Sequence, residues 1–224
     1  MNFCNFHQFE TIKYAESLDI QRTIFNDMIE QKKLGKTPKH HLFFVEHPAV
    51  YTLGKHANAT NFILQPEALK AIGADIHEIE RGGDITFHGP GQLVVYPLFD
   101  LEQLNIGLKK YVQLIEKCII DTLKEFEITA GVIDGRVGVW IDLNKPDERK
   151  IAAIGIKSSR YVTMHGLALN VNTDLNYFNH IVPCGIVDKG VTSMQKELND
   201  KIDMLEVINK MKYHFRCNFE LTEI

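Results

Sequence analysis

The chain lacks long apolar runs and an excess of positive charge. No run of apolar residues approaches the roughly 20 that a membrane-spanning helix needs. The first residues, Met-Asn-Phe-Cys-Asn-Phe-His, have neither the basic nor the apolar region of a secretory signal. Lys and Arg number 25 against 29 Asp and Glu, so the net charge is −4, whereas binding to a nucleic-acid duplex calls for a basic excess. We therefore expect a cytoplasmic protein that binds no membrane and no nucleic acid.

The cysteines and histidines show no disulfide or metal-site spacing. The four cysteines are scattered and are typical of reduced thiols; they are Cys4, Cys118, Cys184 and Cys217. His180 and Cys184 are four residues apart, but Pro183 and Gly185 exclude the helix that would let both bind one metal ion. The sequence has no CxxC or HExxH motif and no GxxxxGK(S/T) phosphate loop. We expect neither a metal nor a cofactor.

What is present is an ordinary globular balance, with 45% hydrophobic and 24% charged residues in 224. A chain of this length can bury a sizeable core within one domain. We find no internal repeat, no low-complexity segment and no linker rich in Pro, Gly or Ser. We therefore expect residues 1–224 to form a single domain.

Apolar residues recur at helical spacing in two long segments, 14–33 and 108–126. Cys118 lies on the apolar face of the second segment, so we interpret it as a core residue. Shorter helices are expected over residues 66–72 and 204–215. All four helices alternate irregularly with the strands described next, which argues against a doubly wound sheet.

Short apolar runs predict six strands, over residues 41–47, 93–101, 131–133, 137–143, 150–156 and 161–171. Pro97 favours an edge or a bend for the second of these. Asp134-Gly135 predicts a hairpin turn, and residues 157–160 join the last two strands. We expect an α/β or α+β fold in which a mixed β-sheet is flanked by helices.

The most unusual stretch is residues 81–96, RGGDITFHGPGQLVVY. Its four glycines allow the backbone to approach a ligand closely, and they expose amide donors. Arg81, Thr86, His88 and Gln92 are polar groups that can converge on one small site. Each glycine alone is best explained by a tight turn, but so many turn and polar residues within sixteen positions favour a binding site.

Cys184 lies between Pro183 and Gly185, which exclude a regular helix or central strand, so a turn presents it. A lone cysteine is more often an inert packed residue than a nucleophile, and a nucleophile needs an activating partner. Lys150 opens an otherwise apolar strand, where partial desolvation would lower its pKa and suit it to act as a base. A solvated lysine at a strand end is the commoner case, and sequence spacing alone does not pair the two residues.

These stretches together resemble the lipoyl(octanoyl) transferases of lipoate biosynthesis. The motif over residues 81–96 is specific to that family. Residues 150–155 (KIAAIG), 165–170 (HGLALN) and 183–185 (PCG) are similar to the later blocks of the family, in the same order. The resemblance covers about residues 44–198 and departs at no position that carries the chemistry.

The resemblance implies the fold of the biotin and lipoate protein ligases, with one cleft in a mixed sheet. Cys184 would be the nucleophile that carries an octanoyl thioester, and Lys150 would lower its pKa. The acyl site would be lined by Arg81, Gly82, Gly83, Asp84, Ile85, Thr86, Phe87, His88, Ala153, Ile154, Gly155, Gly166, Leu167 and Ala168.

The implied activity is that of an octanoyltransferase, which carries out the first step of protein lipoylation. The donor would be octanoyl-acyl carrier protein, and the acceptors would be lysines of the lipoyl domains of 2-oxoacid dehydrogenase E2 subunits and of the glycine cleavage H protein. Charge alone suggests that the carrier protein docks near Lys109, Lys110, Arg136, Lys157 and Arg160. A thioester donor is already activated, so no nucleotide is needed, which agrees with the missing phosphate loop.

Other activities stay open at this point. An ATP-dependent lipoate ligase of the same fold would need no cysteine at position 184, whereas an amidotransferase that relays lipoyl groups would differ only in its donor. A cysteine hydrolase would activate Cys184 with His88 or His165 and release free acid. A non-catalytic module for acyl groups or carrier proteins would bind without forming a covalent adduct.

Overall fold

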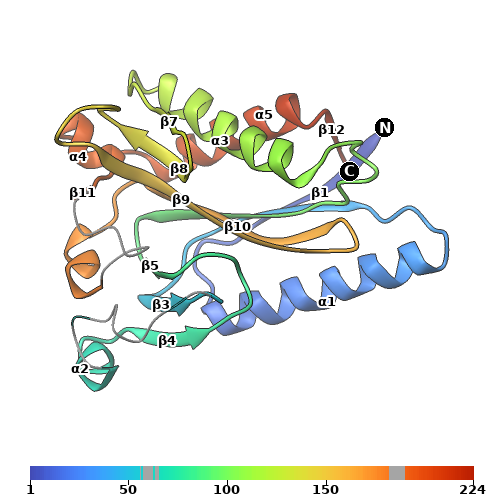
Figure 1. Ribbon diagram of the computed structural model, residues 1–224, viewed down its shortest axis with the longest axis horizontal. Helices are drawn as coiled ribbons and strands as arrows, with labels where there is room; N and C mark the ends of the chain where they lie inside the picture. Colours follow the sequence, from blue (N-terminus) through green and yellow to red (C-terminus); the bar gives the residue numbers. More distant parts are fainter. Residues whose placement is uncertain (56, 58–62, 64–65, 182–189) are drawn as a thin grey trace.

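A computed structural model of the chain describes residues 1–55, 57, 63, 66–181 and 190–224, and its central feature is a mixed β-sheet (Figure 1). Among these residues the strand order is β12-β1-β2-β6-β10-β9-β8-β7, and β11 pairs separately with β9. The bounds are β1 (Asn2–Gln8), β2 (His40–Val45), β6 (Gln92–Leu98), β7 (Gly131–Ile133), β8 (Arg136–Ile141), β9 (Arg149–Ser159), β10 (Val162–Asn170), β11 (Gly190–Val191) and β12 (Leu221–Glu223). β1 is parallel to β2 and β12, and β11 is parallel to β9, whereas the successive pairs from β2 through β6, β10, β9 and β8 to β7 are antiparallel. The expected mixed sheet is confirmed.

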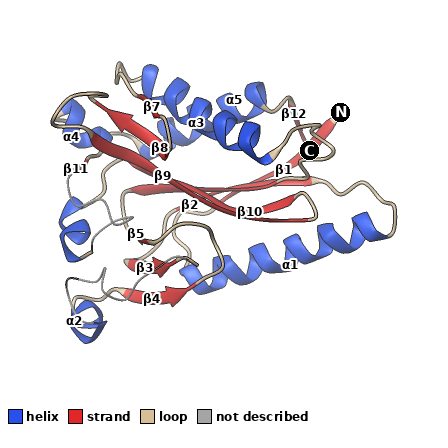
Figure 2. Ribbon diagram, viewed as in Figure 1, coloured by secondary structure: helices blue, strands red, loops and turns tan. Residues whose placement is uncertain are grey.

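Helices cover both faces of this sheet (Figure 2). α1 (Tyr14–Lys33) lies along one face, and α3 (Leu108–Lys124) and α5 (Met204–Asn218) lie along the other. Because strand side chains alternate between faces, Leu42 and Phe44 of β2 pack with α3 and α5, whereas Phe43 and Val45 pack with α1. No helix in the described part of the chain is both long and apolar enough to cross a membrane.

Pro97 lies in a central strand, since β6 runs between β2 and β10, so of the edge and the bend that the sequence suggested, the edge position is wrong. The carbonyl of Pro97 faces β10, where it accepts a hydrogen bond from Thr163 Oγ1 (2.9 Å). β10 pairs with β6 only over residues 92–95, so the missing N–H interrupts no bond of that ladder. Tyr111 Oη donates a further hydrogen bond to the same carbonyl (3.0 Å).

A smaller sheet of β3 (Val50–Leu53), β4 (Asp75–Glu78) and β5 (Ile85–His88), in the order β4-β3-β5, lies near the start of α1 (Figure 1). The remaining short elements are α2 (Pro66–Ala71), the 3-10 helix η2 (Leu175–His180) and α4 (Met194–Leu198). The glycine-rich stretch begins before β5 in the small sheet and continues into β6 in the large sheet. It therefore links the two sheets at one place, and this junction positions the site.

β9 and β10 form a long antiparallel hairpin whose turn is Arg160–Tyr161, both with left-handed φ (48° and 63°). Near its start β9 contains a bulge, because Val139 pairs with Ala152 whereas Trp140 pairs with Lys150. Paired residues share a face of the sheet, so the extra residue turns Lys150 to the face opposite Ala152.

Candidate active site

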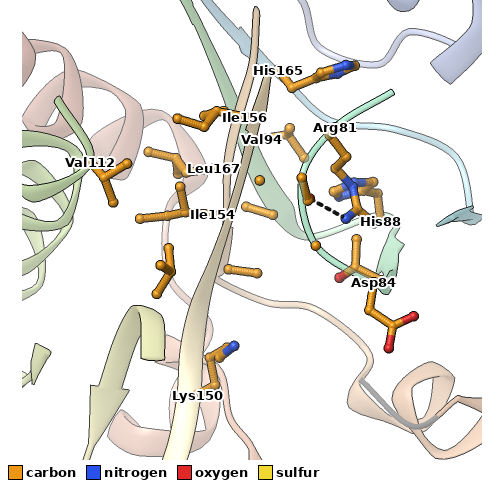
Figure 3. A pocket seen from close by; sticks show the side chains of 18 of the residues that line it. Arg81, Asp84, His88, Val94, Val112, Lys150, Ile154, Ile156, His165 and Leu167 are labelled. Atoms are coloured by element: carbon orange, nitrogen blue, oxygen red, sulfur yellow. Dashed lines mark hydrogen bonds between the residues drawn. The ribbon is translucent and has the colours of Figure 1, made fainter. Parts of the chain in front are cut away.

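A cavity of about 470 Å³ lies where the glycine-rich stretch meets β9 and β10 (Figure 3). This volume is within the range of small-molecule sites in proteins. Of the residues predicted to line an acyl site, all except Phe87 line this cavity: Arg81, Gly82, Gly83, Asp84, Ile85, Thr86, His88, Ala153, Ile154, Gly155, Gly166, Leu167 and Ala168. The ring of Phe87 instead stacks on Tyr177 in the small core (4.5 Å between centroids).

The cavity has two lobes, one on each side of β9 (Figure 3). The lobe that we call the β5 lobe contains Arg81 and His88, and its floor is formed by small residues of β9 and β10. There Gly155 pairs with Gly166 and Ala153 pairs with Ala168, and each pair presents almost no side chain. The intervening pair, Ile154 and Leu167, faces the opposite side of the sheet toward α3, and this second part is the α3 lobe.

The two floor glycines serve different purposes. A Cβ at Gly166 would lie 2.1 Å from the carbonyl oxygen of Val95, so only glycine lets β10 approach β6 this closely. A Cβ at Gly155 would lie 2.9 Å from Cδ of Arg81 and 3.1 Å from the carbonyl oxygen of Gly82. Gly166 therefore serves the packing of the sheet, whereas Gly155 leaves space inside the cavity.

Arg81 holds the glycine-rich stretch against the small sheet. Its Nη2 donates to the carbonyl oxygen of Thr52 (2.8 Å) and to Thr52 Oγ1 (3.0 Å), and its Nη1 donates to the carbonyl oxygen of Gly82 (3.1 Å). The backbone N–H of Gly82 in turn donates to the carbonyl oxygen of Ile156 in β9 (2.9 Å). The guanidinium thus fixes the wall of the β5 lobe to the small sheet, and the Gly82 N–H fixes it to the large sheet.

A chain of buried hydrogen bonds runs from the β5 lobe to Lys150. Gln92 Nε2 donates to Asn170 Oδ1 (2.9 Å), so Gln92 Oε1 is the acceptor for His88 Nδ1–H (2.8 Å). Asn170 Nδ2 donates to the carbonyl oxygen of Thr192 (2.9 Å), and the Thr192 N–H donates to the carbonyl oxygen of Lys150 (2.9 Å). These bonds fix β5, β6, β10 and the segment after β11 relative to the start of β9.

The histidines of the β5 lobe are uncharged at neutral pH. Burial, helped by the nearby His47, lowers the pKa of His88 to about 3. Burial and the charge of Arg81 lower the pKa of His165 to about 3 as well. His165 has a left-handed φ of 62°, its N–H donates to Gln21 Oε1 of α1 (3.1 Å), and neither ring nitrogen has a hydrogen-bond partner among the described residues. Neither ring therefore brings positive charge into the cavity.

Lys150 lines the cavity at one end of the row of residues that β9 contributes (Figure 3). Because of the bulge, it shares a face with Trp140, and its Nζ lies 4.7 Å from the centroid of that ring. Its Cε lies 3.5 Å from where a Cβ at Gly138 would be, so the lysine stem runs beside β8. The Trp140 ring thus holds the Lys150 ammonium where the start of β9 meets the β5 lobe.

Cys184 lies outside the described residues, so its predicted position beside Lys150 stays a prediction. Described residues on both sides of Cys184 in the sequence, Phe178 and Val191, lie near Lys150. Val191 pairs with Lys150, and Ile181, three residues before Cys184, donates its N–H to the carbonyl oxygen of Phe178 (3.3 Å). Phe178 and Lys150 both line a second, smaller cavity of about 30 Å³.

Sequence reasoning missed several residues of the cavity. Tyr14 of α1 and Val94 of β6 line the β5 lobe, and Leu108, Val112 and Val137 line the α3 lobe. Tyr14, Leu108, Val112 and Val137 come from elements that are far apart in the sequence and carry no motif. Val94 lies within residues 81–96, and its alternation with Tyr96 along β6 was the available signal.

The chain matches the family described as the lipoyl protein ligase A/B catalytic domain over residues 13–216. It is 49% identical over 202 residues to the octanoyltransferase of Bacteroides fragilis, covering 90% of this chain and 91% of that protein. It is 48% identical over 219 residues to the octanoyltransferase of Cytophaga hutchinsonii, covering 94% and 90%. In fold it resembles a bipartite lipoate protein ligase from Thermoplasma acidophilum, with a TM-score of 0.74 at 14% identity over 100% of this chain and 86% of that one. The chain therefore belongs to the lipoyl protein ligase A/B catalytic domain family.

Proposed function

We propose that this chain, an enzyme of the octanoyltransferase class, transfers an octanoyl group from acyl carrier protein, through a thioester on Cys184, to a lysine of a lipoyl domain. The observation that carries the proposal is the cavity, which brings the glycine-rich motif and Lys150 to one place on the fold of the lipoate ligases. The acceptors would be lipoyl domains of 2-oxoacid dehydrogenase E2 subunits and of the glycine cleavage H protein. We place the reaction in the cytoplasm, with these partners.

The β5 lobe is suited to an unbranched acyl chain. Its floor of Ala153, Gly155, Gly166 and Ala168 is flat and apolar, and its histidines carry no charge at neutral pH. Burial of an eight-carbon chain contributes up to roughly 5 kcal/mol, at about 0.8 kcal/mol per methylene. This energy is available to hold the donor while the thioester carbon lies near Lys150.

The other cysteines support Cys184 as the nucleophile. Cys4 and Cys118 are buried, and burial raises the pKa of both thiols, which disfavours the reactive thiolate. Cys217 is exposed on α5, and it does not line the cavity. Attack by the Cys184 thiolate breaks the bond between the acyl carbon and the carrier sulfur, so the enzyme thioester forms and the carrier leaves as a thiol. The acceptor amine then displaces the Cys184 sulfur, which gives the amide and restores the free thiol.

A hydrolase that uses His88 or His165 as its base has less support. An imidazole whose pKa is about 3 is a poor acceptor for a thiol proton. His88 also donates its Nδ1–H to Gln92, which fixes the ring within the buried network. Lys150 is the better partner for a thiol at the junction of the lobes.

The proposal predicts a covalent intermediate that forms without nucleotide. Incubation with octanoyl-acyl carrier protein alone should add one octanoyl mass to the intact enzyme, and hydroxylamine should remove it. Addition of a lipoyl domain should then move the group to its lysine.

Three other results would replace the proposal. A requirement for ATP with free octanoate would identify a ligase, and steady release of octanoate without an acceptor would identify a hydrolase. Binding of the donor without any mass increase would identify a non-catalytic module.

The role of the β5 lobe can be tested at Gly155. Gly155→Ala places a methyl group 2.9 Å from Arg81 Cδ and narrows the lobe, and overpacking of this kind costs roughly 1–3 kcal/mol. We expect the second-order rate of acylation to fall about tenfold or more while the protein stays folded, as measured by intact mass and circular dichroism. Gly107→Ala is the matched control, since a Cβ there meets nothing within 4 Å. Equal rates in both variants would show that the acyl chain binds elsewhere.

A further inference from the structure

The α3 lobe takes no part in binding the octanoyl chain or in forming the Cys184 thioester. It lies across β9 from the small-residue floor and is lined by Leu108, Val112, Val137, Ile154, Ile156 and Leu167 (Figure 3). The side chains of Leu108 and Val137 are half exposed, so this lobe opens to solvent between α3 and β8. It forms one cavity with the β5 lobe, which gives a continuous path from Lys150 to the surface.

Within the described ranges, one edge of β9 lacks a partner strand where the two lobes meet. β8 pairs with β9 no further along than Val139 with Ala152, and the next bond on that edge is from the Gly82 N–H to Ile156. Successive residues of a strand direct their N–H and C=O groups to opposite edges. The N–H and C=O of Ile154 therefore point to the same edge as those of Ile156. Between Ala152 and Ile156, the described part of the chain places no strand beside this edge. A ligand with amide groups can pair there.

Positive charge borders the α3 lobe where β8 leaves β9. Arg136 lines the cavity, and its guanidinium carbon lies 6.0 Å from the centroid of Trp140, the ring that also contacts Lys150. None of the described residues that line the α3 lobe is acidic. One guanidinium nitrogen, Nη1, lies 3.5 Å from Glu148 Oε2, and the group keeps further N–H donors for a second anion. Lys109 and Lys110 follow Leu108 on α3 and are exposed.

We propose that the α3 lobe binds the phosphopantetheine arm of the donor thioester, an inference that rests on the proposed function. With the octanoyl chain in the β5 lobe and the thioester near Lys150, the arm leaves over the open edge of β9. Its amides meet the backbone of Ile154, its dimethyl carbon meets Leu108, Val112 and Val137, and its phosphate meets Arg136. A lysine-bearing acceptor is the less suitable occupant, because it would bring a second cation to Arg136.

The first test separates the arm from the acyl chain with small donors. Octanoyl-pantetheine carries both amides and the dimethyl carbon, whereas S-ethyl thiooctanoate carries neither. Val137→Trp should fill the α3 lobe and lower the ratio of kcat/KM for octanoyl-pantetheine over the ethyl thioester by about tenfold. Val132→Trp is the control, because Val132 lies in the same β7–β8 hairpin with similar exposure (47% against 52%) but does not line the cavity. An unchanged ratio in Val137→Trp would overturn the proposal.

The second test concerns the phosphate. The wild type should prefer octanoyl-phosphopantetheine over octanoyl-pantetheine, and Arg136→Ala should lower that preference by about tenfold, because a charge-assisted hydrogen bond is lost. Arg216→Ala, at an exposed arginine on α5, should keep the wild-type preference. A preference that is absent in the wild type, or equal in wild type and Arg136→Ala, would overturn the phosphate contact. If no donor acylates the wild-type enzyme, the proposed function itself fails, which is a different result.

Discussion

Lys150→Ala is expected to slow the acylation of Cys184 at pH 7 on the order of a hundredfold, which is typical for the loss of a positioned acid or base. A free thiol has a pKa near 8.5, so only a few per cent is thiolate at neutral pH. A lysine beside it raises that fraction, either by charge as an ammonium or by accepting the proton as an amine. The thiol itself remains in the variant, so raising the pH should recover part of the rate.

The pH dependence of iodoacetamide labelling at Cys184 measures this effect directly. Lys150→Arg keeps the charge but is not a base, so near-normal labelling in this variant favours charge stabilisation, and loss in both variants favours proton transfer. Lys157→Ala is a matched control on the same strand, because Lys157 also lies over an aromatic ring (5.4 Å from the centroid of Phe25) but does not line the cavity. If the labelling curves of wild type and Lys150→Ala coincide, Lys150 is not the partner of Cys184.

Cys184→Ala should abolish the octanoyl adduct and lower the transfer rate by about 10³-fold or more, as the loss of a covalent nucleophile does in other enzymes. The adduct is measured by intact mass after incubation with octanoyl-acyl carrier protein, and transfer by the mass of the lipoyl domain. The protein should stay folded, with an unchanged melting temperature.

Cys217→Ala is the control, since Cys217 is the exposed thiol among the described cysteines. It should form the adduct at the wild-type rate, as should variants at the buried Cys4 and Cys118 that remain folded. An adduct that survives Cys184→Ala but is lost in any of these variants would assign the nucleophile to a different thiol.

The long helices were predictable because their apolar spacing is repeated over many turns. The segment predicted over residues 14–33 coincides with α1 (Tyr14–Lys33), and the one predicted over 108–126 ends two residues late relative to α3. The strands β1, β3, β4, β5, β11 and β12 were missed. All except β1 are at most four residues long, and each forms through pairing with a partner that local sequence does not reveal. The single domain over residues 1–224 stays a prediction.

The site could be predicted only as far as its motif residues. The glycine-rich stretch indicated Arg81 and His88, and the structure places both in one cavity with Lys150. The face of the sheet to which the Lys150 side chain points depends on the bulge at Ile151. Strict alternation of side chains along β9 would place Lys150 on the opposite face. Phe87 belongs to the same motif, but its ring packs into the small core against Tyr177 instead of lining the cavity. The α3 lobe draws on α3, β8, β9 and β10, and only Ile154 and Leu167 of its lining were among the predicted site residues.

The pairing of the two chain ends has a consequence for synthesis on the ribosome. β1 contains the second residue of the chain, and it lies between β2 and β12, with Asn2 opposite Leu221 (Figure 1). Pairs so distant in sequence slow folding, because the whole intervening chain must be ordered before they form. β12 follows β1 by more than 200 residues, so this edge of β1 has no partner until β12 has been made. We expect the nascent chain to carry an exposed strand edge during that interval, which makes it a candidate for chaperone protection.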